Sequence, residues 1–442
     1  MPQILAPKFA IIDDIIVIKV VNALPQSAVT VSALVVHNES PFIGFGHFYT
    51  NENGALDLSQ DASLGGSYVG LKPMGVFASA QPLITGKRTP RLVVIDADDP
   101  LRYELSLWPG HLDWDRLHRY GFEGWASTHP SRLAVSHLIR SYRSPLVEKV
   151  LIRSSDHPRV RGTLFIPPGP GPFPPVIDMF GAIGGCVEMR AALLAKNGFL
   201  SLALGYIRFL DLPVQTNQDI RLDYFQEAVG YILSHPRARR DRGVGMIGTS
   251  LSSPIVMNMA VRDPRVRIAI PVNTAMFANL DPNSEFLVPG PEFMPQTGEQ
   301  LMQVGYGFRQ GLVQIIRSAD SAPQPKLYTR GPLSHVHETK IAFLLGTQDT
   351  GAPNIELARR VKEYFTSCGR GDQVQLCPIE NEGHLLEPCY MPQSPIATVD
   401  RNISAMMHHG GIRATHLESQ EQGWHTLLRL LREALDPPVA KI

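Results

Sequence analysis

The sequence predicts two domains: an N-terminal all-β sandwich over residues 1–145, followed by an α/β domain with a mostly parallel sheet over residues 146–442. Three observations support this prediction. A chain of 442 residues is longer than a typical single domain. Its N-terminal part contains short segments rich in β-branched and aromatic residues, separated by turn clusters, which is typical of a sandwich. Its remainder alternates apolar strand-like segments with amphipathic segments, which is typical of a sheet covered by helices.

The N-terminal part contains no grouping of side chains that would support catalysis or metal binding. Its histidines, His37, His47 and His111, are scattered along the sequence, which favours surface positions over metal ligation. Two runs that contain glycine or proline, residues 64–68 and 71–75, predict a structural or inter-domain loop, with a wall of a substrate site as the alternative. The predicted strands are residues 15–21, 29–36, 44–49, 92–95 and 102–107.

The second part alternates strands and helices up to a long irregular segment. Residues 176–179 are almost continuously apolar, as expected for a strand buried on both faces of its sheet. Residues 273–337 show little regular period and much Pro, Gly and Gln, which predicts a cap or loop over the site. The predicted strands are residues 146–152, 161–166, 176–179, 199–204, 244–247, 267–272, 340–345 and 373–378, and the predicted helices are residues 188–196, 219–234, 254–261, 355–367 and 418–435.

The composition favours neither a nucleic-acid nor a membrane partner, with a local basic patch as the alternative. Lys plus Arg and Asp plus Glu both number 41, so no overall charge favours nucleic acid or an anionic membrane. No apolar run reaches the roughly 18 residues of a membrane span, and Asp13 and Asp14 interrupt the apolar N-terminus, which does not resemble a secretory signal. The four cysteines favour reduced thiols in a cytosol-like compartment. The last residues, Ala440-Lys441-Ile442, resemble the S-K-L type of peroxisomal address, with a cytoplasmic location as the alternative.

The pentapeptide Gly248-Thr249-Ser250-Leu251-Ser252 is the most informative motif. It joins an apolar strand to a helical segment, which is the layout of a nucleophile elbow that presents one serine hydroxyl on a strained turn. Gly248 suits the crowded position two residues before that serine. Ser252 replaces the second glycine of the usual G-x-S-x-G pattern. On these five residues alone, an ordinary Gly-Thr-Ser turn of an α/β protein remains an alternative.

A serine hydroxyl needs a base and an orienting acid, and both are found downstream. Asp349 and His384 each follow a predicted late strand. With Ser250 as the nucleophile, they occur in the order Ser, Asp, His of the α/β hydrolases. His384 would take the proton of Ser250, and Asp349 would orient the imidazole. Taken singly, Asp349 also fits a carboxylate that caps a turn, and His384 fits a surface-loop histidine.

An oxyanion needs donors already in place. The backbone N–H of Leu251, directly after the nucleophile, is the first candidate. The second is the N–H of Ala182, in the glycine-rich loop of residues 180–185 that follows the first buried strand. The alternative is that these glycines only begin a helix. A phosphate-binding loop is not indicated, because no G-x-x-x-x-G-K-[ST] pattern is present.

Several runs together resemble the family of type I acyl-CoA thioesterases and bile acid-CoA:amino acid N-acyltransferases, over nearly the whole chain. The resemblance implies a β-sandwich followed by an α/β-hydrolase domain, with the nucleophile at Ser250, the acid at Asp349 and the base at His384. Where the family has two small, glycine-like residues after the elbow, this chain has Ser252 and Ser253. The matching runs are residues 64–67, 71–75, 160–165, 170–174, 178–181, 233–236 and 382–384, with Glu387-Pro388.

The first functional hypothesis is a serine hydrolase that converts acyl-CoA thioesters to free acid and CoA, without a metal or organic cofactor. Members of the family that act mainly as N-acyltransferases tend to carry cysteine as the nucleophile, and thioesterases carry serine. Ser250 therefore favours hydrolysis, because an oxygen ester is left mainly to water. Transfer of the acyl group to glycine, taurine or another amine is the alternative. A non-catalytic binding protein and a general carboxylesterase are the remaining readings.

Overall fold

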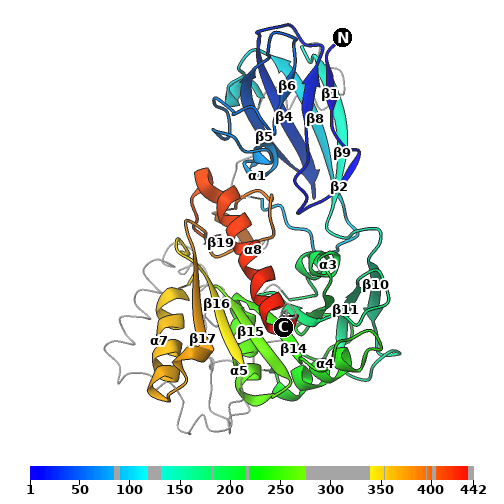
Figure 1. Cartoon of the computed structure of the whole chain (residues 1–442), viewed down its shortest axis with the longest axis vertical. Coiled ribbons are helices and arrows are strands. Elements are labelled where there is room, and N and C mark those ends of the chain that lie inside the picture. The colour runs from blue at the N-terminus through cyan, green and yellow to red at the C-terminus, as the bar shows by residue number, and fades with distance from the viewer. Residues whose placement is uncertain are drawn as a thin grey trace, which may run out of the picture.

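The computed structural model describes residues 1–83, 90–117, 131–181, 184–215, 219–274, 339–352, 354–394, 396–400 and 405–436. Three parts of the sequence predictions lie outside these residues: the oxyanion donor Ala182, residues 275–337 of the predicted cap, and the C-terminal Ala440-Lys441-Ile442. Figure 1 shows a β-rich N-terminal part above an α/β part, as the sequence predicted. Within the described residues, none of the helices has the length and apolar character that crossing a membrane requires.

In the N-terminal part, the described residues form two sheets. The larger sheet has six strands in the order β2-β9-β8-β4-β5-β7, and the smaller has three in the order β1-β3-β6. Alternate apolar side chains such as Val29, Val31 and Val35 point into one buried core, which is the pattern expected of half-buried strands. The elements are β1 (Gln3–Leu5), β2 (Phe9–Ile11), β3 (Lys19–Val21), β4 (Ala28–His37), β5 (Ser40–Tyr49), β6 (Leu56–Asp57), α1 (Gly75–Ala78), β7 (Gln81–Pro82), β8 (Leu101–Pro109) and β9 (Ala134–Ser141).

Two strand predictions in this part are wrong in whole or in part. Residues 15–18 alternate in burial like a strand, but only β3 pairs with a neighbour. Residues 92–95 are not a strand. Leu92 and Val94 are buried there, but the backbone bonds go elsewhere: the carbonyl of Val93 accepts from His37 at 2.7 Å, and the carbonyl of Ile95 accepts from the N–H of Glu188 at 2.9 Å. His37 is therefore buried and hydrogen-bonded, which corrects the prediction of a surface position.

The part of the second domain that the structure describes is built on an eight-stranded sheet. Its strand order is β10-β11-β13-β12-β14-β15-β16-β17. The first two strands are antiparallel to their neighbours, and all later pairs are parallel. This is the mostly parallel sheet that the alternation of segments predicted. Its strands are β10 (Glu148–Ile152), β11 (Arg161–Ile166), β12 (Pro175–Met179), β13 (Leu200–Gly205), β14 (Val244–Thr249), β15 (Val266–Val272), β16 (Lys340–Gly346) and β17 (Val374–Ile379).

Helices cover both faces of this sheet. Strand side chains that point to one face, such as Ile247 and Leu344, share a core with α3 and α8. Those that point to the other face, such as Met246 and Phe343, share a core with α4, α5 and α7. The helices are α3 (Met189–Lys196), α4 (Leu222–Ser234), α5 (Ser253–Arg262), α7 (Asn354–Ser367) and α8 (His416–Leu435), with single 3₁₀ turns η2 (Ser250–Ser252), η5 (Gly371–Gln373) and η6 (Arg413–Thr415). A hairpin of β18 (Ile396–Asp400) and β19 (Ala405–His408) was not predicted.

The two parts contact each other through apolar and charged groups. The predicted boundary after residue 145 falls between β9 and β10. One hydrophobic cluster extends from the sandwich to α3 and α8, and Figure 1 shows α8 running from beside α1 across the sheet. Lys72 donates to the carbonyl of Ala414 at 2.7 Å and pairs with Glu418 at 2.7 Å. The loop of residues 71–75 is therefore an inter-domain contact, which was the first of its two predicted roles.

Candidate active site

The predicted nucleophile lies on a strained turn at the carboxyl end of β14. Strand β14 ends at Thr249, η2 begins at Ser250 and α5 follows at once. Ser250 has φ +56°, a left-handed conformation that non-glycine residues rarely adopt. Such strain is a recognised feature of serine elbows and of functional sites in general. The strand, turn and helix therefore match the predicted elbow in sequence position and in backbone conformation.

Gly248 lies where a side chain cannot fit. A Cβ atom at this position would be 2.4 Å from the carbonyl oxygen of Ser252 and 2.9 Å from Val256. We expect Gly248→Ala to lower the free energy of unfolding by about 1–3 kcal/mol, because the turn must move to accept the methyl group. Chemical denaturation measures this. Gly230→Ala is the matched control, because the nearest atom to a Cβ there is 3.5 Å away. Equal stability of the two variants would contradict the expectation.

The structure brings together the three side chains that the sequence assigned to a triad. The Nε2 atom of His384 lies 3.0 Å from the Oγ atom of Ser250. The Nδ1 atom of His384 lies 2.9 Å from Oδ2 of Asp349. Asp349 follows β16 and His384 follows β17, so the three residues lie at the carboxyl ends of three neighbouring parallel strands. Each ring nitrogen of His384 thus has the partner that proton transfer from a serine requires.

The sequence also allowed Asp349 to be a turn cap and His384 to be a surface-loop residue; the first role is present in the structure and the second is not. Oδ1 of Asp349 accepts from the backbone N–H groups of Gly351 and Ala352, at 2.7 and 3.0 Å. Asp349 therefore caps its turn with one oxygen and contacts His384 with the other. His384 is 3% exposed, so it is not a surface-loop histidine. Its backbone N–H donates to the carbonyl of His409 at 2.6 Å, which holds the loop in place.

Asn273 is a supporting residue that the sequence analysis missed. It follows β15, it is fully buried, and its φ of +45° is one that asparagine tolerates better than most residues. Its amide nitrogen donates to the carbonyls of Gly383 and His384, at 2.9 and 3.0 Å. Its Oδ1 accepts from the N–H of Gly346 at 2.7 Å. One side chain therefore joins the loop of His384 to the end of β16; the only signal in the sequence was an asparagine after a buried strand.

Of the two predicted oxyanion donors, Leu251 lies within the described residues and Ala182 does not. Leu251 lies in η2, directly after Ser250, where N–H groups of a first helical turn have no partner within the helix. The loop that follows β12 reaches the nucleophile, because a Cβ atom on Gly181 would lie 3.3 Å from Cβ and 3.8 Å from Oγ of Ser250. The next residue, Ala182, is outside the described residues and stays a prediction. The approach of Gly181 supports the choice of this loop.

The two serines that follow the elbow are buried and hydrogen-bonded. The hydroxyl of Ser252 contacts the carbonyls of Met179 and Thr249, each at 3.1 Å. The hydroxyl of Ser253 contacts the carbonyls of Gly248 and Val272, at 2.8 and 3.1 Å. Buried polar groups need hydrogen-bond partners of this kind. The elbow therefore accommodates serine where the usual pattern has glycine, and its hydroxyls connect β12, β14 and β15.

A buried ion pair supports the strand ends behind the elbow. Arg190 on α3 donates to Oδ1 of Asp178 on β12 at 2.8 Å through Nε, and to the hydroxyl of Thr249 at 3.0 Å through Nη2. The side chains of Arg190 and Asp178 are 5% and 4% exposed. Burial raises the pKa of Asp178 although the guanidinium group of Arg190 lies beside it. The pair ties the residue before the nucleophile to the neighbouring strand.

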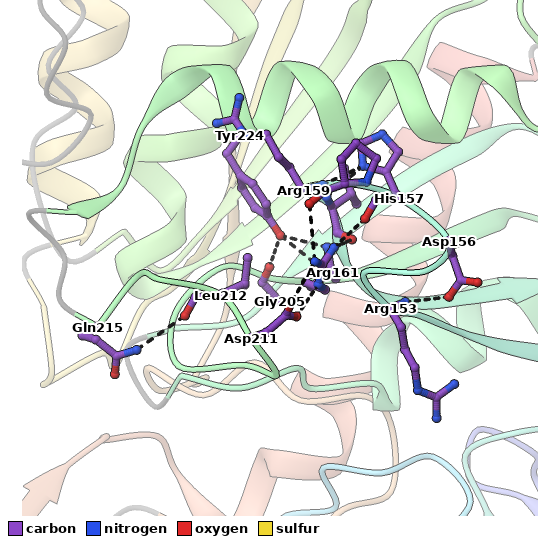
Figure 2. Close-up of polar contacts among 12 residues, drawn as sticks. Arg153, Asp156, His157, Arg159, Arg161, Gly205, Asp211, Leu212, Gln215 and Tyr224 are labelled. Carbon is purple, nitrogen blue, oxygen red and sulfur yellow. Dashed lines mark hydrogen bonds and ion pairs between the residues drawn. The ribbon is translucent and has the colours of Figure 1, made fainter.

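A second set of contacts holds the chain after β13, next to the glycine-rich loop. Figure 2 shows Arg161 between Asp211 and Tyr224. Arg161 makes two bonds to the carboxylate of Asp211, at 2.6 and 2.9 Å, and the hydroxyl of Tyr224 donates to the carbonyl of Gly205. Gly205 ends β13, and the N–H of Gly185 donates to the carbonyl of Ile207 at 2.8 Å. The contacts of Arg161 and Tyr224 therefore anchor the segment that the glycine-rich loop lies against.

The Arg161–Asp211 pair predicts a pH-dependent contribution to stability. The hydrogen bond from Arg161 lowers the pKa of Asp211 to about 2, against about 3.9 in an unfolded chain. A lowered pKa stabilises the folded state above the unfolded value and loses that effect as the pH falls toward 2. We expect Asp211→Asn to unfold at lower urea than the wild type at pH 6, with a smaller gap at pH 3. An equal gap at both pH values would contradict this.

Comparison with known proteins agrees with this architecture. The family model "Acyl-CoA thioester hydrolase/BAAT N-terminal region" matches residues 13–154, and "BAAT / Acyl-CoA thioester hydrolase C terminal" matches residues 220–437. Acyl-coenzyme A amino acid N-acyltransferase 1 of Mus musculus is 31% identical over 98% of this chain and 97% of its own. Acyl-coenzyme A thioesterase 1 of Homo sapiens is 32% identical over 94% and 92%. Bile acid-CoA:amino acid N-acyltransferase of Homo sapiens is 30% identical over 98% and 97%.

Proposed function

The chain belongs to the family of acyl-CoA thioester hydrolases and bile acid-CoA:amino acid N-acyltransferases, and on that premise we propose that it hydrolyses acyl-CoA thioesters through an acyl-enzyme on Ser250. The observation that carries the proposal is the hydrogen-bonded chain from Asp349 through His384 to Ser250, with 2.9 and 3.0 Å between the polar atoms. Similarity to proteins named acyl-CoA thioesterases supports the substrate class.

In the first half of the reaction, the Oγ atom of Ser250 attacks the thioester carbonyl carbon while Nε2 of His384 takes its proton. Asp349 holds the Nδ1–H and stabilises the imidazolium ion. The backbone N–H of Leu251, and the predicted second donor at Ala182, would stabilise the oxyanion of the tetrahedral intermediate. When this intermediate collapses, the carbon–sulfur bond breaks, the proton on His384 passes to sulfur, and free CoA thiol leaves an ester on Ser250.

In the second half, water replaces CoA beside the ester. Nε2 of His384 takes a proton from the water as its oxygen attacks the carbonyl carbon, and the same oxyanion donors act again. Collapse of this intermediate breaks the bond to Oγ of Ser250, returns the proton to that oxygen and releases the carboxylic acid. Every step uses side chains and backbone N–H groups of this chain, so the proposed chemistry requires no metal or organic cofactor.

Hydrolysis is preferred over transfer to an amine because the nucleophile is a serine. An acyl-cysteine is a thioester that amines attack readily, whereas the ester on Ser250 reacts mainly with water. Transfer to glycine or taurine is the second candidate, because relatives named N-acyltransferases match the chain over 98% of its length. Both candidates share the acyl-enzyme and differ only in the group that attacks it.

Purified protein tested on acyl-CoAs of short, long, branched and steroid-like chains decides between the candidates. Free thiol is measured together with the mass of the products, with and without glycine or taurine. We expect free acid as the main product, and a fall on the order of 10⁴-fold in Ser250→Ala. A dominant conjugate would favour the transferase, and an unaffected Ser250→Ala variant would refute the proposed nucleophile. Faster turnover of an oxygen ester than of its CoA thioester would indicate a carboxylesterase.

A further inference from the structure

Tyr206 forms hydrogen bonds with the backbone of the glycine-rich loop. It follows β13, it is 4% exposed, and its hydroxyl lies 2.7 Å from the carbonyl of Phe180 and 3.2 Å from that of Gly181. Burial raises the pKa of Tyr206, so the hydroxyl keeps the proton that it donates. The backbone of the preceding residue, Gly205, is anchored by Tyr224 (Figure 2). Tyr206 is therefore a fixed donor to the first two peptide units after β12.

Ser252 contacts the same region from the side of the elbow. Its hydroxyl reaches the carbonyl of Met179, the residue before Phe180, and that of Thr249, the residue before the nucleophile, each at 3.1 Å. Its side chain also lowers the pKa of Tyr206 against the effect of burial. Two hydroxyls on different elements therefore contact the carbonyls of three consecutive residues, Met179 at the end of β12 and Phe180 and Gly181 in the loop. The hydroxyl of Ser252 also contacts the elbow, at Thr249.

The carbonyl of Gly181 has a consequence for catalysis. The residue that follows Gly181 in the chain is the one from which the sequence predicts the second oxyanion donor. A bond to the carbonyl of Gly181 therefore restrains the residue directly before that donor. A Cβ atom added to Gly181 itself would lie 3.8 Å from Oγ of Ser250, so the restrained end of the loop lies beside the nucleophile.

We infer that Tyr206 and Ser252 are positioning residues that hold Phe180 and Gly181 at a fixed distance from the elbow, and that this placement supports stabilisation of the oxyanion. This inference rests on the proposed function. It also gives a role to the serine that stands where G-x-S-x-G has glycine: its hydroxyl joins the elbow to β12. Oxyanion donors act only when they lie about 2.7–3.1 Å from the developing charge, so a small shift of this loop reduces the rate.

The test compares Tyr206→Phe, Ser252→Ala and the double variant in the full-length protein. Each removes one hydroxyl and little volume. We expect Tyr206→Phe to lower kcat by about 10- to 100-fold with little change in KM, because ground-state binding does not use the oxyanion donors fully. We expect the double variant to lose less than the product of the two single losses, since both residues act on one loop.

Thr339→Val is the matched control for loss of a buried hydroxyl bond. Thr339 is 2% exposed and donates to the carbonyl of Val266 at 2.8 Å. Val266 begins β15, at the amino ends of the parallel strands, whereas Ser250 lies at their carboxyl ends. We expect this variant to lose stability comparably in chemical denaturation and to keep its kcat. A kcat of Tyr206→Phe equal to that of the wild type would overturn the inference and leave the proposed function standing. An equal fall of kcat in Thr339→Val would also overturn it.

A second readout separates this inference from the proposed substrate. A fluorophosphonate probe labels a reactive serine by forming an O–P bond with loss of fluoride, and its phosphoryl oxygen occupies the oxyanion site. We expect the labelling rate of Tyr206→Phe to fall in parallel with kcat. If the wild type is labelled but releases no thiol from acyl-CoAs, the proposed function fails, and a slower labelling of Tyr206→Phe still supports the positioning role. A wild type that is not labelled overturns both.

Discussion

Asp349→Asn is expected to lower kcat by about 10⁴-fold while the protein stays folded. The side-chain oxygen of the asparagine can still accept from the N–H groups of Gly351 and Ala352, so the turn keeps its cap. Its amide group then faces His384, where it donates instead of accepting. The imidazole must turn or take the other tautomer, and Nε2 can no longer accept the proton of Ser250. Thiol release from an acyl-CoA, with single-turnover kinetics, measures the loss.

Two comparisons make this expectation specific. The urea midpoint of Asp349→Asn should remain close to that of the wild type, because the turn keeps its cap. Combining it with Ser250→Ala should add little further loss, since residues of one catalytic unit are strongly non-additive. A fall in kcat of less than about 10-fold, in a protein of unchanged stability, would show that Asp349 only caps its turn.

Arg190→Met is expected to reduce the free energy of unfolding by about 3–5 kcal/mol, the largest effect on stability that we predict. The substitution leaves the carboxylate of Asp178 buried without its cation and removes the bond to Thr249 at 3.0 Å. Chemical denaturation of the full chain measures the change. The same variant should show slower acylation, because Thr249 directly precedes Ser250.

The double variant Arg190→Met with Asp178→Leu is the control. Replacing both members of a buried ion pair by apolar groups is often close to neutral, so the double variant should be more stable than Arg190→Met alone. The deficit of Arg190→Met should also shrink as the pH falls. Burial already raises the pKa of Asp178, and protonation removes the charge that lacks a partner. A double variant at least as unstable as the sum of the single variants would contradict this account.

The candidate site was found from the sequence because its three side chains each follow a strand. Carboxyl ends of parallel strands meet at one edge of a sheet, so residues 134 and 35 positions apart along the chain come within hydrogen-bond distance. The strand–turn–helix pattern around Ser250 and the downstream Asp349 and His384 were sufficient for this. The family resemblance stated from the motifs is confirmed by the relatives and family models. Ala182 as a donor stays a prediction.

The supporting residues were not found because their roles depend on contacts between distant segments. Asn273 looks like the beginning of an irregular segment, yet it bonds to Gly383, 110 residues away. Residues 92–95 have the pattern of a strand, but the segment passes between the two parts of the chain and bonds to His37 and Glu188 instead of a neighbouring strand. Hydrophobic pattern reports which side chains are buried, and it does not report which partner a backbone group will have.

The sequence by itself determined the class of the two parts, most of their strands and helices, and the choice of Ser250, Asp349 and His384 as the candidate triad. These follow from local signals: periodicity, turn residues and the chemistry that a serine nucleophile requires. Only the tertiary structure decided what surrounds them, including the ion pair of Arg190 and the contacts of Tyr206 and Ser252 with the end of β12 and the loop after it. Such contacts join groups whose spacing along the chain carries no information, because the packing of helices and loops on the sheet sets their distances.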